Sequence, residues 1–218
     1  DADQFLMRAS ASSGGSAFVA LLNADDKVER INYDQNINEG MIVNALGGDD
    51  YFAIDDNRIS TTINGGLGND SFQVGQLFRS QRTEAANIGA DDVFATIETT
   101  QGFLSNGITL PMTINGQAGN DEFIVFHNKA VLTLSGGDDN DTFAIKAFAL
   151  AGSQEDERER TDLSGDQGAD FIQYAVNAPV GIYGGDGFDT VVVIGTEFAD
   201  DFVITEDGVF GAGLFVTL

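Results

Sequence analysis

An aspartate returns about every 20 residues along this chain, each time at the end of a glycine-rich segment. The segments that align best on this aspartate are 44–54, 63–74, 114–125, 134–145, 163–174 and 182–193. A repeat of this length, interrupted by insertions, is typical of solenoids, in which every repeat stacks on its neighbours. We therefore predict that residues 1–218 form one solenoid domain, and that this domain is a fragment of a larger repeat protein.

The apolar residues repeat in the same register as the aspartates. A large apolar side chain stands two residues after each aspartate, at Phe5, Val28, Phe52, Phe72, Phe94, Phe123, Phe143, Ile172 and Val191. Apolar and polar residues alternate on both sides of the glycine-rich segment, which indicates two short strands joined by a tight turn. The pattern predicts an all-β fold, a parallel β-solenoid of the β-roll or β-helix kind, with one such turn in each rung of about 20 residues.

Weaker repeats extend this interpretation to further rungs, headed by Asp3, Asp26 and Asp92. Two insertions interrupt the ladder. Residues 79–110 are expected to hold a degenerate rung with an extra loop, and residues 149–161 a charged excursion.

The glycine-rich segments share the pattern Gly-Gly-x-Gly-x-Asp-x-apolar, which is complete at residues 65–72 and 184–191. Glycine adopts the left-handed backbone conformations that such a tight turn needs. Calcium binds six to eight hard oxygen ligands, a mixture of carboxylate and carbonyl oxygens. One turn cannot supply all of them, but two stacked turns can. We therefore expect several calcium ions, about four or five, between stacked turns along one edge of the solenoid.

The expected ligands are the repeat aspartate at position six of each turn and the residues at positions one and three. The set comprises Asp50, Gly65, Leu67, Asp70, Gly116, Ala118, Asp121, Gly136, Asp138, Asp141, Gly165, Gln167, Asp170, Gly184, Asp186 and Asp189. For Asp138 and Asp186 two interpretations stay open, a side-chain ligand or a carboxylate that faces solvent. Asp26 and Asp92 lack the glycines and fit ordinary turns better.

These repeats resemble the RTX (hemolysin-type) calcium-binding repeats of type-I-secreted bacterial proteins. The resemblance rests on residues 65–72 and 184–191, and more loosely on the segments that end at Asp121, Asp141 and Asp170. It implies a parallel β-roll with calcium between the turns, in a chain that folds after export into calcium-rich surroundings. One motif per 20 residues, instead of two in direct succession, predicts a calcium column on one edge only.

The charge of the chain favours a cation-dependent fold. Against 35 Asp and Glu stand 10 Lys and Arg, a formal net charge of −25, and repulsion on this scale opposes a compact state unless cations neutralise it. Such a polyanion is a poor partner for nucleic acid. The sequence contains no run of 18 apolar residues, so we expect no membrane insertion.

The sequence contains few groups for other chemistry. There is no cysteine, and His127 is the single histidine, expected at the surface or in a turn. The usual zinc sites and catalytic triads therefore lack their residues. We expect no catalytic residues and no cofactor besides calcium.

The expected function is structural: a calcium-dependent extender in a large secreted or cell-surface bacterial protein, such as an adhesin, matrix component or filament. One alternative is the secretion and stability module of an enzyme whose catalytic domain lies elsewhere. Another is a catalytic β-helix that acts on polysaccharide. Calcium is the expected partner, and exposed end rungs suggest end-to-end self-association or stacking on adjacent repeats.

Overall fold

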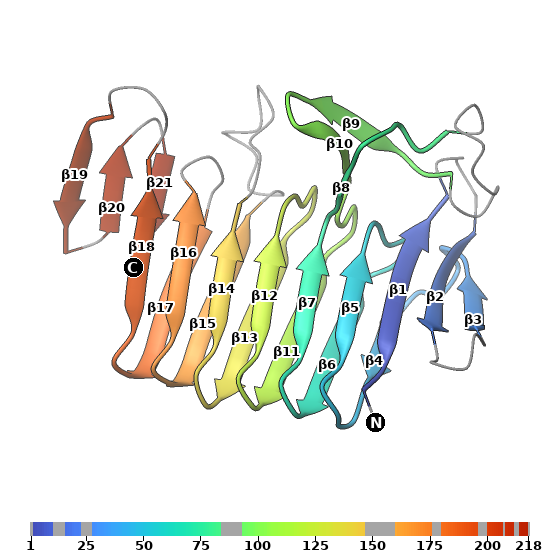
Figure 1. Ribbon diagram of the computed structural model, residues 1–218, viewed down its shortest axis with the longest axis horizontal. Helices are drawn as coiled ribbons and strands as arrows, with labels where there is room; N and C mark the ends of the chain where they lie inside the picture. Colours follow the sequence, from blue (N-terminus) through green and yellow to red (C-terminus); the bar gives the residue numbers. More distant parts are fainter. Residues whose placement is uncertain are drawn as a thin grey trace.

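The computed structural model describes residues 2–10, 16–22, 28–83, 93–146, 160–175, 180–195, 200–206, 208–211 and 214–217. Within these residues every regular element is a β-strand, arranged in two nine-stranded sheets and one small three-stranded sheet (Figure 1). No helix in this part of the chain is long and apolar enough to cross a membrane.

The first large sheet, called sheet A, has the strand order β18-β16-β14-β12-β7-β5-β1-β2-β3. Its strands are β18 (Thr190–Ile194), β16 (Phe171–Ala175), β14 (Thr142–Ile145), β12 (Glu122–Val125), β7 (Ser71–Val74), β5 (Tyr51–Ile54), β1 (Gln4–Ala9), β2 (Ala17–Leu22) and β3 (Val28–Tyr33).

The second large sheet, called sheet B, has the order β19-β20-β21-β17-β15-β13-β11-β6-β4. Its strands are β19 (Phe202–Thr205), β20 (Gly208–Gly211), β21 (Leu214–Thr217), β17 (Val180–Gly187), β15 (Thr161–Gly168), β13 (Leu132–Asp138), β11 (Met112–Ala118), β6 (Thr61–Leu67) and β4 (Met41–Asn44).

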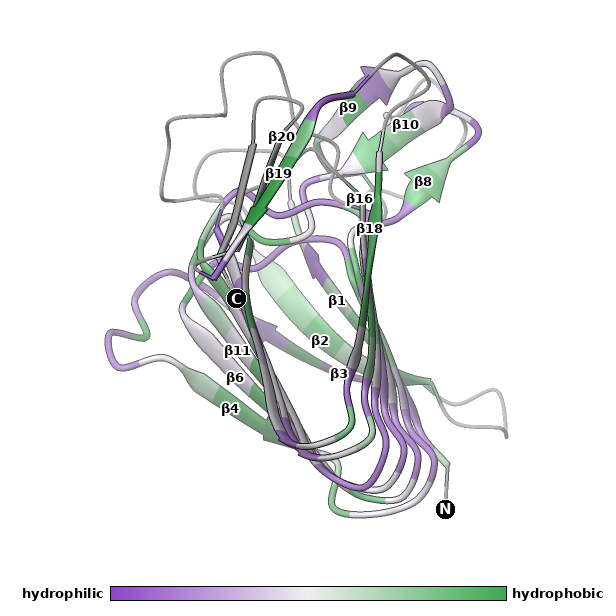
Figure 2. Ribbon diagram, turned by 90° about the vertical axis from the view of Figure 1, so that its left-hand side faces the viewer, coloured by the Kyte–Doolittle hydropathy of each residue, from purple (hydrophilic) through white to green (hydrophobic). Residues whose placement is uncertain are grey.

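Each rung consists of one strand of sheet B, a glycine-rich turn and one strand of sheet A, and six rungs are complete within the described residues. Neighbouring rungs pair in parallel with like residues opposite each other, for example Ile63 with Ile114 and Phe72 with Phe123. Figure 2 shows the two sheets as facing layers that meet at the row of turns. The expected all-β fold of stacked parallel strands is confirmed.

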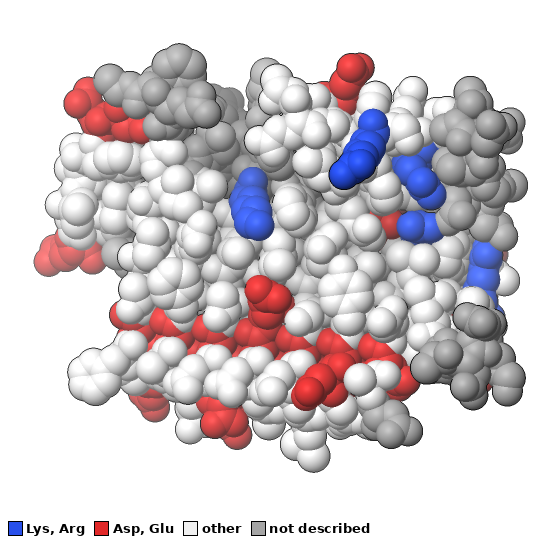
Figure 3. Space-filling view, in the orientation of Figure 1, with Lys and Arg blue, Asp and Glu red and all other residues white. Residues whose placement is uncertain are grey.

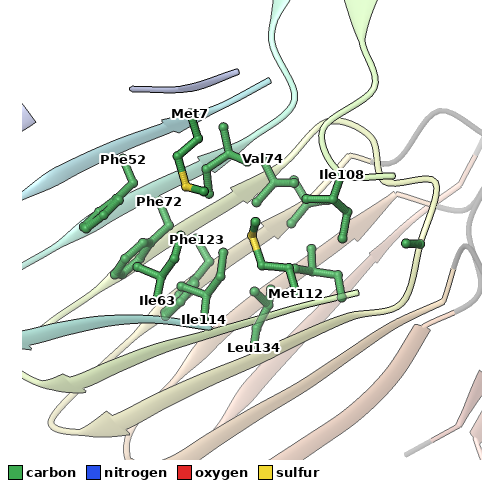
Figure 4. Packing of buried hydrophobic residues seen from close by; sticks show 14 of the residues in the cluster. Met7, Phe52, Ile63, Phe72, Val74, Ile108, Met112, Ile114, Phe123 and Leu134 are labelled. Atoms are coloured by element: carbon green, nitrogen blue, oxygen red, sulfur yellow. The ribbon is translucent and has the colours of Figure 1, made fainter. Parts of the chain in front are cut away.

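The core is a stack of like side chains from successive rungs. Phe5, Phe52, Phe72, Phe123 and Phe143 form a continuous column with successive ring centroids 4.4, 5.1, 5.0 and 4.7 Å apart. Aliphatic residues of sheet B pack against this column from the opposite layer (Figure 4). These aliphatic residues are Ile63, Ile114, Leu134, Leu163 and Ile182.

The expected rung headed by Asp26 is not formed. β1 pairs directly with β5, so the rung of Phe5 stacks on that of Phe52, and β2 and β3 continue sheet A as an antiparallel meander. Val28, expected in the core, is 60% exposed. Asp26 itself lies outside the described residues. A segment without the turn glycines cannot make the tight turn, and here it pairs back on its own chain instead.

The expected degenerate rung within 79–110 is also absent, because β6 and β7 stack directly on β11 and β12. Two strands of this insertion, β9 (Thr96–Thr99) and β10 (Gly102–Ser105), form a separate antiparallel sheet with β8 (Leu77–Phe78), which directly precedes it. Phe94 is buried beside Phe78, away from the main column. Asp92 lies outside the described residues, as does most of the predicted excursion 149–161.

Candidate metal centre in the aspartate column

The turn of every rung depends on two left-handed backbone positions, four and two residues before the repeat aspartate. Their φ angles are positive in all six rungs. Glycine occupies most of these positions, as Gly66 and Gly68 do with φ of 116° and 122°. Leu46, Gln117, Asp139 and Asp166 are the exceptions. A non-glycine residue there is strained, which explains why the sequence repeats glycine at this spacing.

The repeat aspartates stack into a buried ladder, called here the aspartate column: Asp50, Asp70, Asp121, Asp141 and Asp170, each at most 2% exposed, with Asp189 half-buried at one end. In each of them Oδ1 accepts a hydrogen bond from the backbone N–H of the aspartate one rung earlier. The N···O distances are 2.6 Å from Asp3 to Asp50 and 2.7–3.1 Å between the later pairs. Backbone and side chain together therefore fix one turn upon the next.

A second ladder runs one residue earlier and in the opposite sense. Asp49, Asn69, Asn120 and Asn140 each accept, through Oδ1, the backbone N–H of the corresponding residue one rung later, at 2.7–3.0 Å. This ladder was not predicted from the sequence, although the recurrent Asn-Asp pair was its signal.

The second carboxylate oxygen of the column has no such partner. Oδ2 of Asp50, Asp70, Asp121, Asp141 and Asp170 is buried without a hydrogen bond. In the later rungs this atom lies against the first glycine of its own turn. A Cβ added to Gly65, Gly116, Gly136 or Gly165 would come within 2.0–2.1 Å of it. Glycine is required there because the carboxylate occupies the space of a side chain.

A carbonyl oxygen of the next rung faces the same place. The Cβ of Gly65 would lie 2.9 Å from the carbonyl oxygen of Gly116, and that of Gly136 would lie 2.8 Å from that of Gly165. The Cβ of Gly116 would likewise lie close to the carbonyl oxygen of Gly136, and that of Gly165 close to the carbonyl oxygen of Gly184. Four such cradles therefore each combine one carboxylate oxygen and one carbonyl oxygen. Both are hydrogen-bond acceptors, so they cannot bond to each other and need a cation, a proton or a donor such as water between them.

The electrostatics of the column point to the same need. Burial raises the pKa of the five buried aspartates from Asp50 to Asp170, and it raises those of Asp121 and Asp141 to about 7. The hydrogen bond from the preceding aspartate lowers these pKa values, while the charge of neighbouring column members raises them further. The ionised column is therefore costly unless positive charge compensates it. Figure 3 shows it as a continuous acidic band along the turn edge.

The donor set fits a hard cation such as calcium, since it consists only of carboxylate and carbonyl oxygens. The described residues bring no group of three or more His, Cys, Asp or Glu side chains together on one point. An ion in a cradle would therefore rely on one column carboxylate supplemented by backbone carbonyls.

The predicted ligands at position three lie differently. The carbonyl oxygens of Leu67 and Ala118 accept backbone hydrogen bonds from Gly48 and Gly68 of the adjacent rungs, at 2.8 and 3.0 Å. Asp138, Gln167 and Asp186 have exposed side chains. Asp138 Oδ1 accepts a hydrogen bond from Gln167 Nε2 at 2.6 Å. The structure thus brings the column aspartates and the first glycines together, and leaves these side chains at the rim.

The opposite edge of the solenoid holds a different polar cluster. Asp55 is fully buried, and its Oδ2 accepts a hydrogen bond from Arg8 Nε at 2.8 Å. His127 belongs to a turn, as expected, but it is buried, with Nδ1 3.1 Å from the carbonyl oxygen of Ser105. Burial lowers its pKa to about 4, so the imidazole is neutral at physiological pH.

No family model, no curated protein and no solved structure matches this chain.

Proposed function

We propose that this chain is a calcium-dependent structural module, an extender within a large secreted or cell-surface bacterial protein such as an adhesin, matrix component or filament. The supporting observation is a row of four buried Oδ2 atoms without a hydrogen bond, each of which lies beside a glycine and faces a carbonyl oxygen of the next rung. They belong to Asp70, Asp121, Asp141 and Asp170. Calcium in these cradles would satisfy both acceptors at once.

The residues that would hold the ions are the column aspartates and the first glycines of the following turns. Each carboxylate is already oriented by the hydrogen bond to its Oδ1, which leaves Oδ2 turned toward the glycine. The ion supplies the positive charge that offsets repulsion along the column. Because the cradle spans two rungs, ion binding and stacking are one event, so affinity for calcium becomes stability of the fold.

Circular dichroism and thermal melting of the metal-free chain during a calcium titration test the proposal. We expect calcium to increase the β signal and the melting temperature, and magnesium to do less because it demands a smaller octahedral site. Asp141→Asn should raise the calcium concentration at the midpoint. The matched control is Glu122→Gln, which removes one exposed charge from the adjacent strand and should leave the midpoint in place.

Full β structure with an unchanged melting temperature in excess chelator would refute the proposal. An equal shift of the midpoint by both variants would also count against it, because general charge repulsion would then account for the effect.

A further inference from the structure

The two large sheets are offset from each other by three strands. Six strands of each sheet belong to the complete rungs. Beyond the first rung only sheet A continues, through β1, β2 and β3, and beyond the last rung only sheet B continues, through β21, β20 and β19. Each end of the solenoid therefore carries a three-strand overhang that has no opposite layer within the described residues (Figure 1).

Most described residues on the inner faces of the two overhangs are apolar, with Glu29 of β3 as a charged exception, and they become uncovered only at the outermost strand. At the N-terminal end Met7, Val19 and Ile31 pair in one row and are 0, 9 and 69% exposed. At the C-terminal end the row starts at Val180, which is 3% exposed, and ends at Ile204, which is 76% exposed. Each overhang thus presents the kind of surface that the body of the solenoid buries.

A groove of about 850 Å³ lies where the N-terminal overhang passes the end of sheet B. Val19, Ile31 and Tyr33 line it from sheet A, and Met41 and Val43 line it from β4. β4 is the last strand of its sheet, so its outer edge is unpaired among the described strands.

The direction of the outermost strands matches the body of the solenoid. β1 is parallel to β5, and two antiparallel steps through β2 make β3 parallel to it again. Likewise β21 is parallel to β17, and two antiparallel steps make β19 parallel to it. A strand added at either end in the direction of the rungs would therefore continue a parallel pairing.

From this geometry we propose that a second copy of this chain docks head to tail, with the N-terminal overhang of one copy opposite the C-terminal overhang of the other. β3 then lies beside β18 of the other copy, and β4 beside β19. The strand lengths agree, with six residues against five in sheet A and four against four in sheet B. Both sheets become continuous, and the exposed inner-face residues Ile31 and Ile204 become covered.

Three of the four edge strands lack the features with which natural sheets block their edges, because β4, β18 and β19 carry no charged residue and no proline. β3 carries Glu29 and Arg30. The contact is heterologous, and because each copy continues both sheets of the previous one along the solenoid axis, it generates linear oligomers. This inference stands apart from the proposed calcium sites, because it rests on the ends and not on the turns.

The experiment uses two variants that each block one end. Ile31→Lys places a charge on the inner face of the N-terminal overhang, and Ile204→Lys does so at the C-terminal end. Light scattering after size exclusion and sedimentation velocity measure mass against concentration, in calcium and at moderate salt so that the net charge of −25 is screened. Phe171→Lys is the control, because this exposed residue lies on a strand that is paired on both sides.

We expect the unmodified chain and Phe171→Lys to form oligomers that grow with concentration, and each end variant alone to be monomeric. A mixture of the two end variants should form a dimer and nothing larger, because one intact end of each kind remains. Ile31→Ser and Phe202→Lys, which also change the inner faces of β3 and β19, replace an end variant that fails to fold by circular dichroism. A monomeric unmodified chain at every concentration overturns the inference, as does an end variant that oligomerises alone.

Discussion

The two carboxylate oxygens of the repeat aspartate have different partners. Oδ1 accepts a backbone hydrogen bond from the neighbouring rung, whereas Oδ2 is buried without a hydrogen bond beside the first glycine of its turn. The first contact requires only an acceptor, and the second requires a positive partner. Variants that keep the first and change the second can therefore separate them.

Asp121→Asn is the sharpest such variant. The amide oxygen still accepts the N–H of Asp70, while the amide nitrogen replaces the oxygen that faces the carbonyl of Gly136. Without calcium at pH 8 we expect the variant to be at least as stable as the unmodified chain, because a buried charge is gone. With calcium we expect it to be less stable, because a ligand is gone. Urea unfolding without and with calcium measures whether the order of stability of the two proteins reverses. A variant that is more stable than the unmodified chain under both conditions would argue for a protonated carboxyl in the cradle.

The metal-free protein should lose stability as the pH rises. The pKa values of Asp121 and Asp141 are raised to about 7 in the fold, so the folded state holds these protons more tightly than the unfolded chain does. Their contribution is fully present below pH about 4 and is lost between there and about 7. Urea unfolding of the calcium-free chain across this range measures it. A stability that rises through the same window, as buried neutral His127 alone would produce, contradicts the assignment.

The first glycine of the turn should tolerate no side chain. In Gly136→Ala the new Cβ would lie 2.0 Å from Asp141 Oδ2, although the backbone angle there is one that alanine can adopt. We expect a loss of about 1–3 kcal/mol together with weaker calcium binding. Gly47→Ala, whose Cβ would meet its nearest atom at 3.3 Å, is the control and should change both quantities little. Equal effects of the two substitutions would show that the carboxylate is not the obstacle.

At the scale of the element, the phenylalanine column stabilises the stacking of rungs on the side opposite to the aliphatic row. Phe123 lies in the middle, between Phe72 and Phe143, and is fully buried. Phe123→Ala should cost about 3–5 kcal/mol of unfolding free energy in saturating calcium. Phe5→Ala, at the partly exposed end of the column, should cost clearly less. Thermal or urea unfolding measures whether Phe123→Ala loses more stability than Phe5→Ala. Equal losses of unfolding free energy would mean that the rungs do not form one core.

The turn and the strands on either side of it could be predicted from the sequence, since glycine, aspartate and apolar residues recur there at fixed spacing. The elements that lack these glycines could not be predicted in this way. Val28 and Phe94 occupy the expected position two residues after an aspartate, yet they lie outside the column, because a chain without the turn pairs with itself in antiparallel hairpins. The ligand role of the carbonyl oxygens of Leu67 and Ala118 stays a prediction, but the hydrogen bonds that they accept from adjacent rungs could not be predicted from the sequence. Which neighbour a backbone group contacts depends on the register between rungs, and one rung does not reveal it.

At the scale of the whole molecule, stacked parallel rungs place like charges above one another, and the net charge of −25 makes this costly. The solenoid meets that cost at one edge with the hydrogen-bonded column and, on our proposal, with calcium. The offset of the two sheets adds a second property, an end that complements its opposite end. A calcium-stiffened rod that also joins end to end would suit an extended surface structure.

The most direct measurement is a crystal structure of the chain grown with calcium and recorded at a wavelength where calcium scatters anomalously. The account predicts anomalous density in the cradles between the column aspartates and the first glycines of the following turns, from Gly65 to Gly184. Ordered turns with no such density, and a hydrogen atom or water between Oδ2 and the facing carbonyl, would contradict it.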